Sequence, residues 1–373
     1  MNKKIAVLFN GFALCYADTF AQICKKNNIQ IDFYTFDNQP YNGQNADNVF
    51  CVGQKPNLKN VNQLKSFDKK FKEITKNQNY DYVLSDCLPL SFTVNVFHSV
   101  SLGKRMQCAP FYLYRLIFML GHFKRIMHER KFYTKSPKTI VVSSYLKNDY
   151  SINCNIPDES FEIIYPGMSI DNVEEPVSPP FYDETKPFVV GMNANGFTTK
   201  GGYVLLNALR ILKKTNPSLN LKAKIIYPKF HKLSFVNLFI KLYGLEKMVE
   251  ICPYQKDMKA FYRSLNCFIC PSKYEAFGRV VIEAMYYKVP VIAGTNAGAV
   301  DIIEDGINGY VFKFNENSAN NLAMKIKTVQ KDYKEISTIT ENAYKTAKSI
   351  TWEKFAENLY QDFYDKNNKP ALV

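Results

Sequence analysis

The sequence predicts an α/β protein with two doubly wound parallel-sheet domains. Three observations support this: the chain has 373 residues, short apolar runs alternate with helical segments, and a proline-rich stretch interrupts the alternation. A chain of this length suits two domains of roughly 150–200 residues. Alternating strands and helices favour parallel sheets, and two such domains in tandem predict a ligand cleft between two sets of strand carboxyl ends.

The first half of the chain predicts six strands covered on both faces, because the runs are nearly continuously apolar and rich in valine, isoleucine and aromatics. These runs are residues 5–9, 29–34, 49–52, 82–84, 94–97 and 140–142, and helices are expected over 16–26 and 64–76. Residues 171–187 then hold four prolines and five acidic residues. Proline breaks helices and central strands, so this segment is expected to link the two domains.

The alternation of strands and helices resumes after residue 187. Strands are expected at 188–191, 223–227, 249–251, 267–270, 289–293 and 310–312, and helices over 203–213, 256–264, 279–287 and 318–329. Residues 333–366 show a helical pattern throughout. The predicted organisation is therefore a first domain over 1–170, the linker 171–187, a second domain over 188–350, and a C-terminal helix within 351–373.

The composition is that of a globular protein, with 46% apolar and 22% charged residues and a net charge of +14. The longest apolar run, residues 111–120, is interrupted by Arg115 and falls short of the ~18 residues that span a bilayer. About five apolar residues precede Asn10, too few for a signal peptide, so the N-terminus is expected to be the first strand of a cytoplasmic protein. Nine cysteines, an odd and scattered number, agree with a reducing compartment.

No metal site is predicted. Cys267 and Cys270 have the spacing of a metal or redox pair, but a second pair is missing, and strand alternation would point the two side chains to opposite faces. The four histidines also lack ligand spacing. The cysteines are therefore interpreted as structural.

The strongest chemical signal is the segment PSKYEAFGRVVIEAM at residues 271–285. An apolar strand ends, a loop carries Glu275, and Gly278 opens a helix that contains Glu283. The free N–H groups of Gly278, Arg279 and Val280 would form an anion site at the helix N-terminus. Two carboxylates eight residues apart could then hold different parts of one ligand, although each could equally be an ordinary surface or helix glutamate.

This segment, together with KVPVIAGTNAGAVDIIEDGINGYVF at 288–312, resembles the donor-binding half of glycosyltransferase family 4. The resemblance implies a retaining enzyme that uses a nucleotide diphosphate sugar, favouring a UDP-sugar. It implies the GT-B fold, in which two Rossmann-like domains face each other across a cleft and the C-terminal helices cross back to the first domain. Gly11 falls on the family's acceptor-domain glycine loop, and Lys200 on its phosphate-binding lysine.

The resemblance also implies roles for these residues. Lys200 would neutralise the leaving diphosphate together with the N-terminus of the helix at 278–280, so that no metal or other cofactor is needed. Glu283 would accept hydrogen bonds from the ribose hydroxyls, and Glu275 would act near the developing oxocarbenium, either as a nucleophile or as an electrostatic partner. Phe277 and Arg279 complete the implied donor site.

One departure from the family concerns the phosphate site. The family usually has Gly-Arg-Leu after the first strand of the second domain, whereas this chain continues from Gly191 to Lys200 without arginine. Thr198, Thr199 or Arg279 are candidates to replace the missing cation or donor.

Two residues of the first domain follow predicted strands. His98 stands where the family often places a histidine near the donor sugar's primary hydroxyl, although a lone histidine after a strand is more often structural. Asp86 ends the preceding strand and is a candidate acceptor-site residue.

The stretch 104–138 carries nine basic residues and one acidic residue, with aromatic residues between them. Helical spacing puts Arg115, His122, Arg125 and Glu129 on one face and Lys124, Lys131, Lys135 and Lys138 on a second stripe. A basic helix with apolar flanks suits an anionic membrane surface, and this predicts peripheral association with the inner face of the plasma membrane. The alternative is a helix half-buried in its own domain with a solvated basic edge.

The same region is similar to the lipopolysaccharide core glucosyltransferase I branch of the family, which implies a glycan or glycolipid acceptor on the membrane. Two alternatives remain: a transferase for a soluble or protein acceptor, and a non-catalytic relative. Nucleic-acid binding fits the positive charge, but the sequence has no recognition helix, RNP-type strand or zinc module, and no nucleic-acid partner is predicted.

Overall fold

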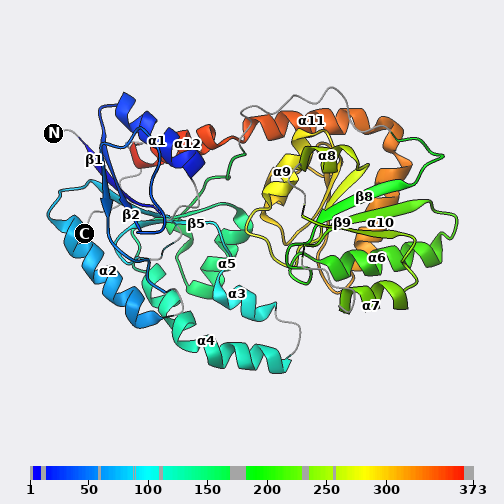
Figure 1. The fold of residues 1–373 in the computed structure, drawn as a ribbon, viewed down its shortest axis with the longest axis horizontal. Helices are drawn as coiled ribbons and strands as arrows, with labels where there is room; N and C mark the ends of the chain where they lie inside the picture. The colour runs from blue at the N-terminus through cyan, green and yellow to red at the C-terminus, as the bar shows by residue number, and fades with distance from the viewer. Residues whose placement is uncertain are drawn as a thin grey trace. The chain divides into compact units, whose positions relative to one another are not determined.

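The computed structural model describes residues 3–9, 14–57, 60–86, 88, 90–108, 112–168, 182–228, 235–254 and 258–364. These residues form two compact units (Figure 1). The first holds the described residues of Met1–Ser169 and of Thr351–Val373, and the second holds those of Ile170–Ile350. Each unit is built on a parallel sheet, which confirms the predicted fold class.

The sheet of the first unit has seven strands in the order β3-β2-β1-β4-β5-β6-β7. Their bounds are β1 (Lys4–Leu8), β2 (Gln30–Thr35), β3 (Asn48–Cys51), β4 (Tyr82–Asp86), β5 (Val94–Phe97), β6 (Thr139–Val141) and β7 (Phe161–Ile163). The order changes direction between β1 and β4, the point where ligands commonly bind in such sheets. β7 has only three residues and was not predicted; its pairing with β6 holds it in the sheet.

The helices of the first unit cover both faces of this sheet. They are α1 (Leu14–Lys26), α2 (Val61–Lys76), α3 (Leu102–Gln107), α4 (Tyr112–Tyr133), α5 (Ser144–Cys154) and α12 (Trp352–Tyr364). Alternation along β1 explains the two cores. Ile5 and Val7 pack with α1 and α12, whereas Ala6 and Leu8 pack with α2.

The C-terminal helical region is not continuous, which corrects the prediction for 333–366. A 3₁₀ turn, η3 (Tyr333–Glu335), leads into α11 (Ile336–Ser349), and the helix stops at Ile350, where φ is −111° and ψ is 81°. α12 then packs against α1 in the first unit, with the rings of Phe355 and Tyr16 4.7 Å apart. Neither glycine nor proline marks the break. It arises because the apolar faces of α11 and α12 pack in different units.

The sheet of the second unit has six strands in the order β10-β9-β8-β11-β12-β13. Their bounds are β8 (Phe188–Asn193), β9 (Leu221–Ile226), β10 (Val249–Cys252), β11 (Cys267–Cys270), β12 (Val291–Gly294) and β13 (Tyr310–Phe312). The helices are α6 (Gly202–Thr215), α7 (Phe235–Leu242), α8 (Met258–Arg263), α9 (Arg279–Tyr286), α10 (Ser318–Lys331) and α11, with a 3₁₀ turn η2 (Gly298–Ile302).

The predicted linker 171–187 is shorter than expected at its C-terminal end. Tyr182 packs on Phe188 and Tyr333, at ring-centroid distances of 5.1 and 5.5 Å, and so belongs to the core of the second unit. Residues 171–181 lie outside the described residues. Among the described helices, none is long and apolar enough to cross a bilayer.

Candidate functional site

The candidate site of the second unit lies where two neighbouring strands end. β8 and β11 are paired and parallel, so the loops that follow them, 194–201 and 271–278, leave the same edge of the sheet. The two loops are joined directly, because the N–H of Lys273 donates to the carbonyl oxygen of Thr199 at 2.9 Å.

Two glycines make this close approach possible. Gly201 has φ +78°, and a Cβ there would lie 1.8 Å from the carbonyl oxygen of Pro271. Gly278, the residue before α9, has φ +100°, and its Cβ would lie 3.2 Å from Cγ of Glu275. Both positions require a left-handed backbone and space for a neighbouring loop, which only glycine supplies without strain.

The structure brings together two residues that the sequence singled out. Nζ of Lys200 is hydrogen-bonded to Oε2 of Glu275, and the two side chains are 34% and 18% exposed. The backbone of Glu275 is held on both sides: its N–H donates to Asn296 at 3.0 Å, and its carbonyl accepts from Gly298 at 3.1 Å. A cation and a carboxylate are thus fixed at one accessible place.

Lys200 and Glu275 line a pocket of about 220 Å³. Its lining also includes Val280 in the first turn of α9, and Asn193, Asn195 and Ser272, which sequence reasoning missed. The signal for these three is that they are polar residues at the end of a buried apolar strand or just after it. Thr198, Thr199 and Arg279 are not among the lining residues, and the Thr199 hydroxyl donates within its own loop to Gly196 at 2.9 Å. That one of these three residues replaces the missing arginine stays a prediction.

Glu283 is held by a residue that the sequence did not indicate. Its Oε2 accepts a 2.8 Å hydrogen bond from the hydroxyl of Tyr262, a fully buried residue of α8. Burial raises the pKa of Tyr262 well above its ordinary value, so the hydroxyl stays a donor. Glu283 is not among the residues lining the 220 Å³ pocket. Phe277 is buried, and its carbonyl accepts from the N–H of Ala299 at 2.7 Å, whereas Arg279 is exposed.

The cysteine pair of β11 consists of free thiols buried in the sheet. Burial raises the pKa of Cys270 to about 11 and raises that of Cys267 still further. Both thiols therefore stay protonated and unreactive. No group of three or more metal-ligating side chains is found within the described residues.

In the first unit, the two candidates Asp86 and His98 lie side by side. Asp86 ends β4 and His98 follows β5, its parallel neighbour, so both project from one edge of the sheet. Nε2 of His98 lies 3.3 Å from Oδ1 of Asp86, and the side chains are 6% and 1% exposed. A carboxylate in this position can orient the imidazole. Gly11 lies outside the described residues.

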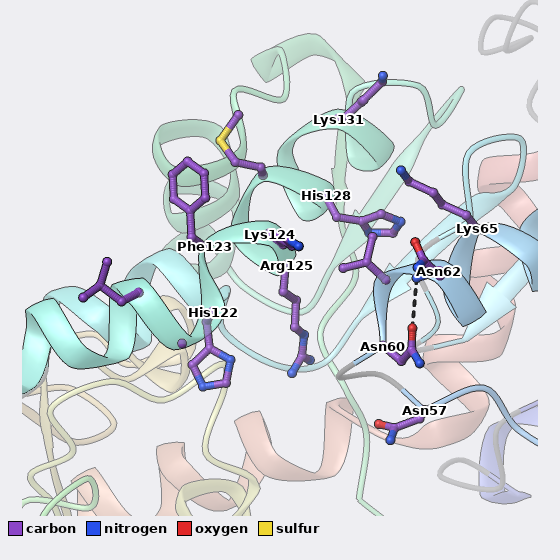
Figure 2. A pocket seen from close by; sticks show the side chains of 14 residues that line it. Asn57, Asn60, Asn62, Lys65, His122, Phe123, Lys124, Arg125, His128 and Lys131 are labelled. Carbon is purple, nitrogen blue, oxygen red and sulfur yellow. Dashed lines mark hydrogen bonds between the residues drawn. The ribbon is translucent and has the colours of Figure 1, made fainter.

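The basic stretch is less uniform than its spacing predicted. α4 ends at Tyr133, so Lys135 lies beyond the helix, and Lys138 forms an ion pair with Asp362 of α12. The predicted four-lysine stripe is therefore wrong, and it is reduced to the exposed Lys124 and Lys131. His122 and Arg125 line a pocket of about 950 Å³ with these two lysines (Figure 2). The side chain of Arg115 lies outside the described set.

Comparison with known proteins supports a specific family for the second unit. Residues 178–346 match the family model described as glycosyl transferases group 1. The capsular polysaccharide biosynthesis glycosyltransferase CapM of Staphylococcus aureus is 27% identical over 181 residues, covering 47% of this chain and 46% of that protein. The chain spans about half the length of the curated relatives it matches.

Two solved structures match nearly the whole chain. WaaG, a glycosyltransferase involved in lipopolysaccharide biosynthesis, has a TM-score of 0.65 at 18% identity, covering 97% of this chain and 99% of its own. HepE of Anabaena, in complex with UDP and glucose, has a TM-score of 0.64 at 18% identity, covering 98% and 100%. These likenesses show the two-domain fold of GT-B glycosyltransferases. Residues 178–346 of this chain are therefore similar to the glycosyl transferases group 1 family, and the chain as a whole shares the fold of GT-B glycosyltransferases.

Proposed function

We propose that the protein is a retaining, metal-independent hexosyltransferase that moves a sugar from a nucleotide diphosphate, with UDP favoured, to a membrane-associated glycan or lipid. The observation that carries the proposal is the Lys200–Glu275 pair, held in a pocket where two strand-end loops meet the first turn of α9. The group 1 match and the UDP complex of the structurally similar HepE support the donor class.

The chemistry of the donor explains the positive half of this pair. When the glycosidic bond breaks, negative charge grows on the departing diphosphate, and a fixed cation beside it stabilises the transition state by several kcal/mol. Lys200 would exchange its carboxylate partner for a phosphate oxygen of the donor. The N–H groups of Gly278, Arg279 and Val280 would add the positive end of the α9 dipole.

The acidic groups would serve the sugar and the ribose. Glu275, released from Lys200, would place negative charge near the developing oxocarbenium. Glu283 would accept hydrogen bonds from the ribose hydroxyls. The hydrogen bond that it receives from Tyr262 orders its carboxylate before the ligand arrives. His98, oriented by Asp86, would contact the donor sugar.

The acceptor side rests on the first unit. The exposed face of α4 combines cations with large apolar residues, as expected for a protein at the inner face of the plasma membrane. CapM is named for capsular polysaccharide biosynthesis and WaaG for lipopolysaccharide biosynthesis. Both names favour an acceptor of the cell envelope.

Thermal unfolding with a panel of nucleoside diphosphates tests the donor site directly. A true ligand of the folded state raises Tm. We expect UDP to raise Tm more than GDP or ADP, and the increase to disappear in Lys200→Ala. Lys222→Ala, which removes an exposed lysine of β9, is the matched control. An unchanged UDP response in Lys200→Ala would refute the proposed site.

A further inference from the structure

The largest pocket described above lies entirely within the first unit, between α2 and α4. Arg125 and His128 reach from α4 toward the N-terminal end of α2, where Asn60 caps the helix and Lys65 lies in its second turn (Figure 2). Asn60 accepts from the N–H groups of Asn62 and Gln63, at 3.1 and 3.3 Å. The backbone amides are thus already engaged, and a ligand here would be held by side chains.

The lining of this pocket has one sign of charge. Four of its residues are lysine or arginine, two are histidine, and none of the fourteen described lining residues is acidic. Burial lowers the pKa of His128 to about 4, and the charges of Lys65 and Arg125 act in the same direction. The nearest acid on α4, Glu129, lines the adjoining smaller pocket, and its carboxylate accepts from the N–H of Leu102 at 3.1 Å. An anion would therefore be attracted to the α2–α4 pocket.

Exposed apolar residues beside the pocket indicate what kind of molecule would carry that anion. Leu116, Leu120, Phe123 and Met127 are spaced by four, three and four residues, so they share one face of α4. All four are exposed, Leu120 by 69% and Phe123 by 56%. Three of them line the pocket themselves. Lys124 and Lys131 line the same pocket. Apolar side chains next to cationic ones suit an amphiphile, because its hydrocarbon chain can cover the apolar side chains while its charged head group meets the cations.

We propose that the α2–α4 pocket binds the phosphate group of a membrane amphiphile whose apolar chain lies along Leu116, Leu120, Phe123 and Met127. Arginine and lysine side chains are the usual phosphate ligands, and Arg125 with Lys65 offers them from both walls. That this amphiphile is the sugar acceptor rests on the proposed function, whereas the phosphate site itself does not. Such a pocket differs from a diffuse basic patch, because binding depends on where each cation lies and not only on the total charge.

Three soluble probes separate the parts of the amphiphile: dihexanoyl phosphatidic acid, glycerol 3-phosphate without the chains, and hexyl glucoside without the phosphate. The readout is the imidazole chemical shifts of His122 and His128, with His98 as the internal reference. We expect phosphatidic acid to shift both signals, glycerol 3-phosphate to shift them with weaker affinity, and hexyl glucoside to leave them in place.

The variants decide between a pocket and a patch. Lys65→Gln and Arg125→Gln should weaken phosphatidic acid binding about tenfold, as expected for one charged hydrogen bond. Lys70→Gln removes the same charge from the same helix outside the pocket and should change affinity by less than about twofold. Gly121→Leu should block binding without changing charge, because Gly121 lines the pocket and a Cβ there meets no atom within 4 Å.

Equal weakening in Lys65→Gln and Lys70→Gln, or a His128 signal that ignores both phosphate probes, would overturn the inference. Failure of this proposal and failure of the proposed function are distinguishable. The nucleotide-induced rise in Tm reports on the second unit, whereas the His128 signal reports on the first.

Discussion

The ammonium group of Lys200 is hydrogen-bonded to the carboxylate of Glu275, which lies 75 residues further along the chain. The two side chains come from loops that leave adjacent parallel strands. A ligand that binds either side chain would have to replace the other one as its partner. The pair therefore keeps a cation and an acid ordered at the same edge of the sheet before any substrate is present.

The role of Glu275 predicts a loss of turnover with little loss of nucleotide affinity. Glu275→Gln keeps the shape of the side chain but removes the negative charge, so turnover of a UDP-sugar should fall by about 100-fold or more. Single-turnover assays and UDP titrations on the same variant would separate the two effects. Glu246→Gln, an exposed acid of the same unit, should behave like the natural protein. Full turnover in Glu275→Gln would contradict the assigned role.

The loop contact at Gly201 predicts a large cost for one methyl group. Gly201→Ala would place Cβ 1.8 Å from the Pro271 carbonyl oxygen, forcing the two loops apart, and should lower the free energy of unfolding by about 2–4 kcal/mol. Gly306→Ala is the control, because Gly306 has a similar φ of +82° but open space around it. It should cost only about 1–2 kcal/mol from backbone strain. Urea unfolding would show whether the costs differ in this order.

The hydrogen bond between Tyr262 and Glu283 predicts a binding defect with normal packing. Tyr262→Phe removes the donor but keeps the ring, which stacks on Tyr287 at a centroid distance of 5.5 Å. We expect KM for the nucleotide sugar to rise by about three- to tenfold, with kcat changed little, because the Glu283 carboxylate loses its orientation. Tyr243→Phe in the same unit should leave both constants unchanged. A fall in kcat at unchanged KM would instead place Tyr262 in the chemical step.

Two adjacent residues of α4 predict opposite dependences of stability on pH. Burial raises the pKa of Glu129 from 4.5 to about 7, so its folded form prefers the proton and stability is lost as pH rises from about 4.5 to 7. Burial lowers the pKa of His128 from 6.5 to about 4, so stability is lost as pH falls from about 6.5 to 4. Each effect is worth about 3 kcal/mol at most.

Urea unfolding of single variants across this pH range would separate the two groups. Glu129→Gln should remove the loss at rising pH, and His128→Asn should remove the loss at falling pH. Identical pH profiles for the natural protein and both variants would show that neither group is perturbed as described.

Much of this organisation could be predicted from the sequence, because it is written in local patterns. Buried parallel strands appear as apolar runs, and the residues that follow them, such as Asp86 and Glu275, mark the edge where ligands bind. Gly278 is recognisable because a strand, a loop and a helix surround it, and a left-handed backbone at such a turn requires glycine. Sequence was equally able to indicate the basic, aromatic character of α4.

Only the tertiary structure decided the contacts between elements that are distant in the chain. The partners of Glu283 and Lys138, which are Tyr262 and Asp362, depend on how helices pack, and no local pattern specifies them. The break at Ile350 has the same origin, since the chain turns there only because two apolar stripes bury themselves in different units. A short strand such as β7 is stable only through pairing, so its three residues carry too little signal to be recognised in isolation.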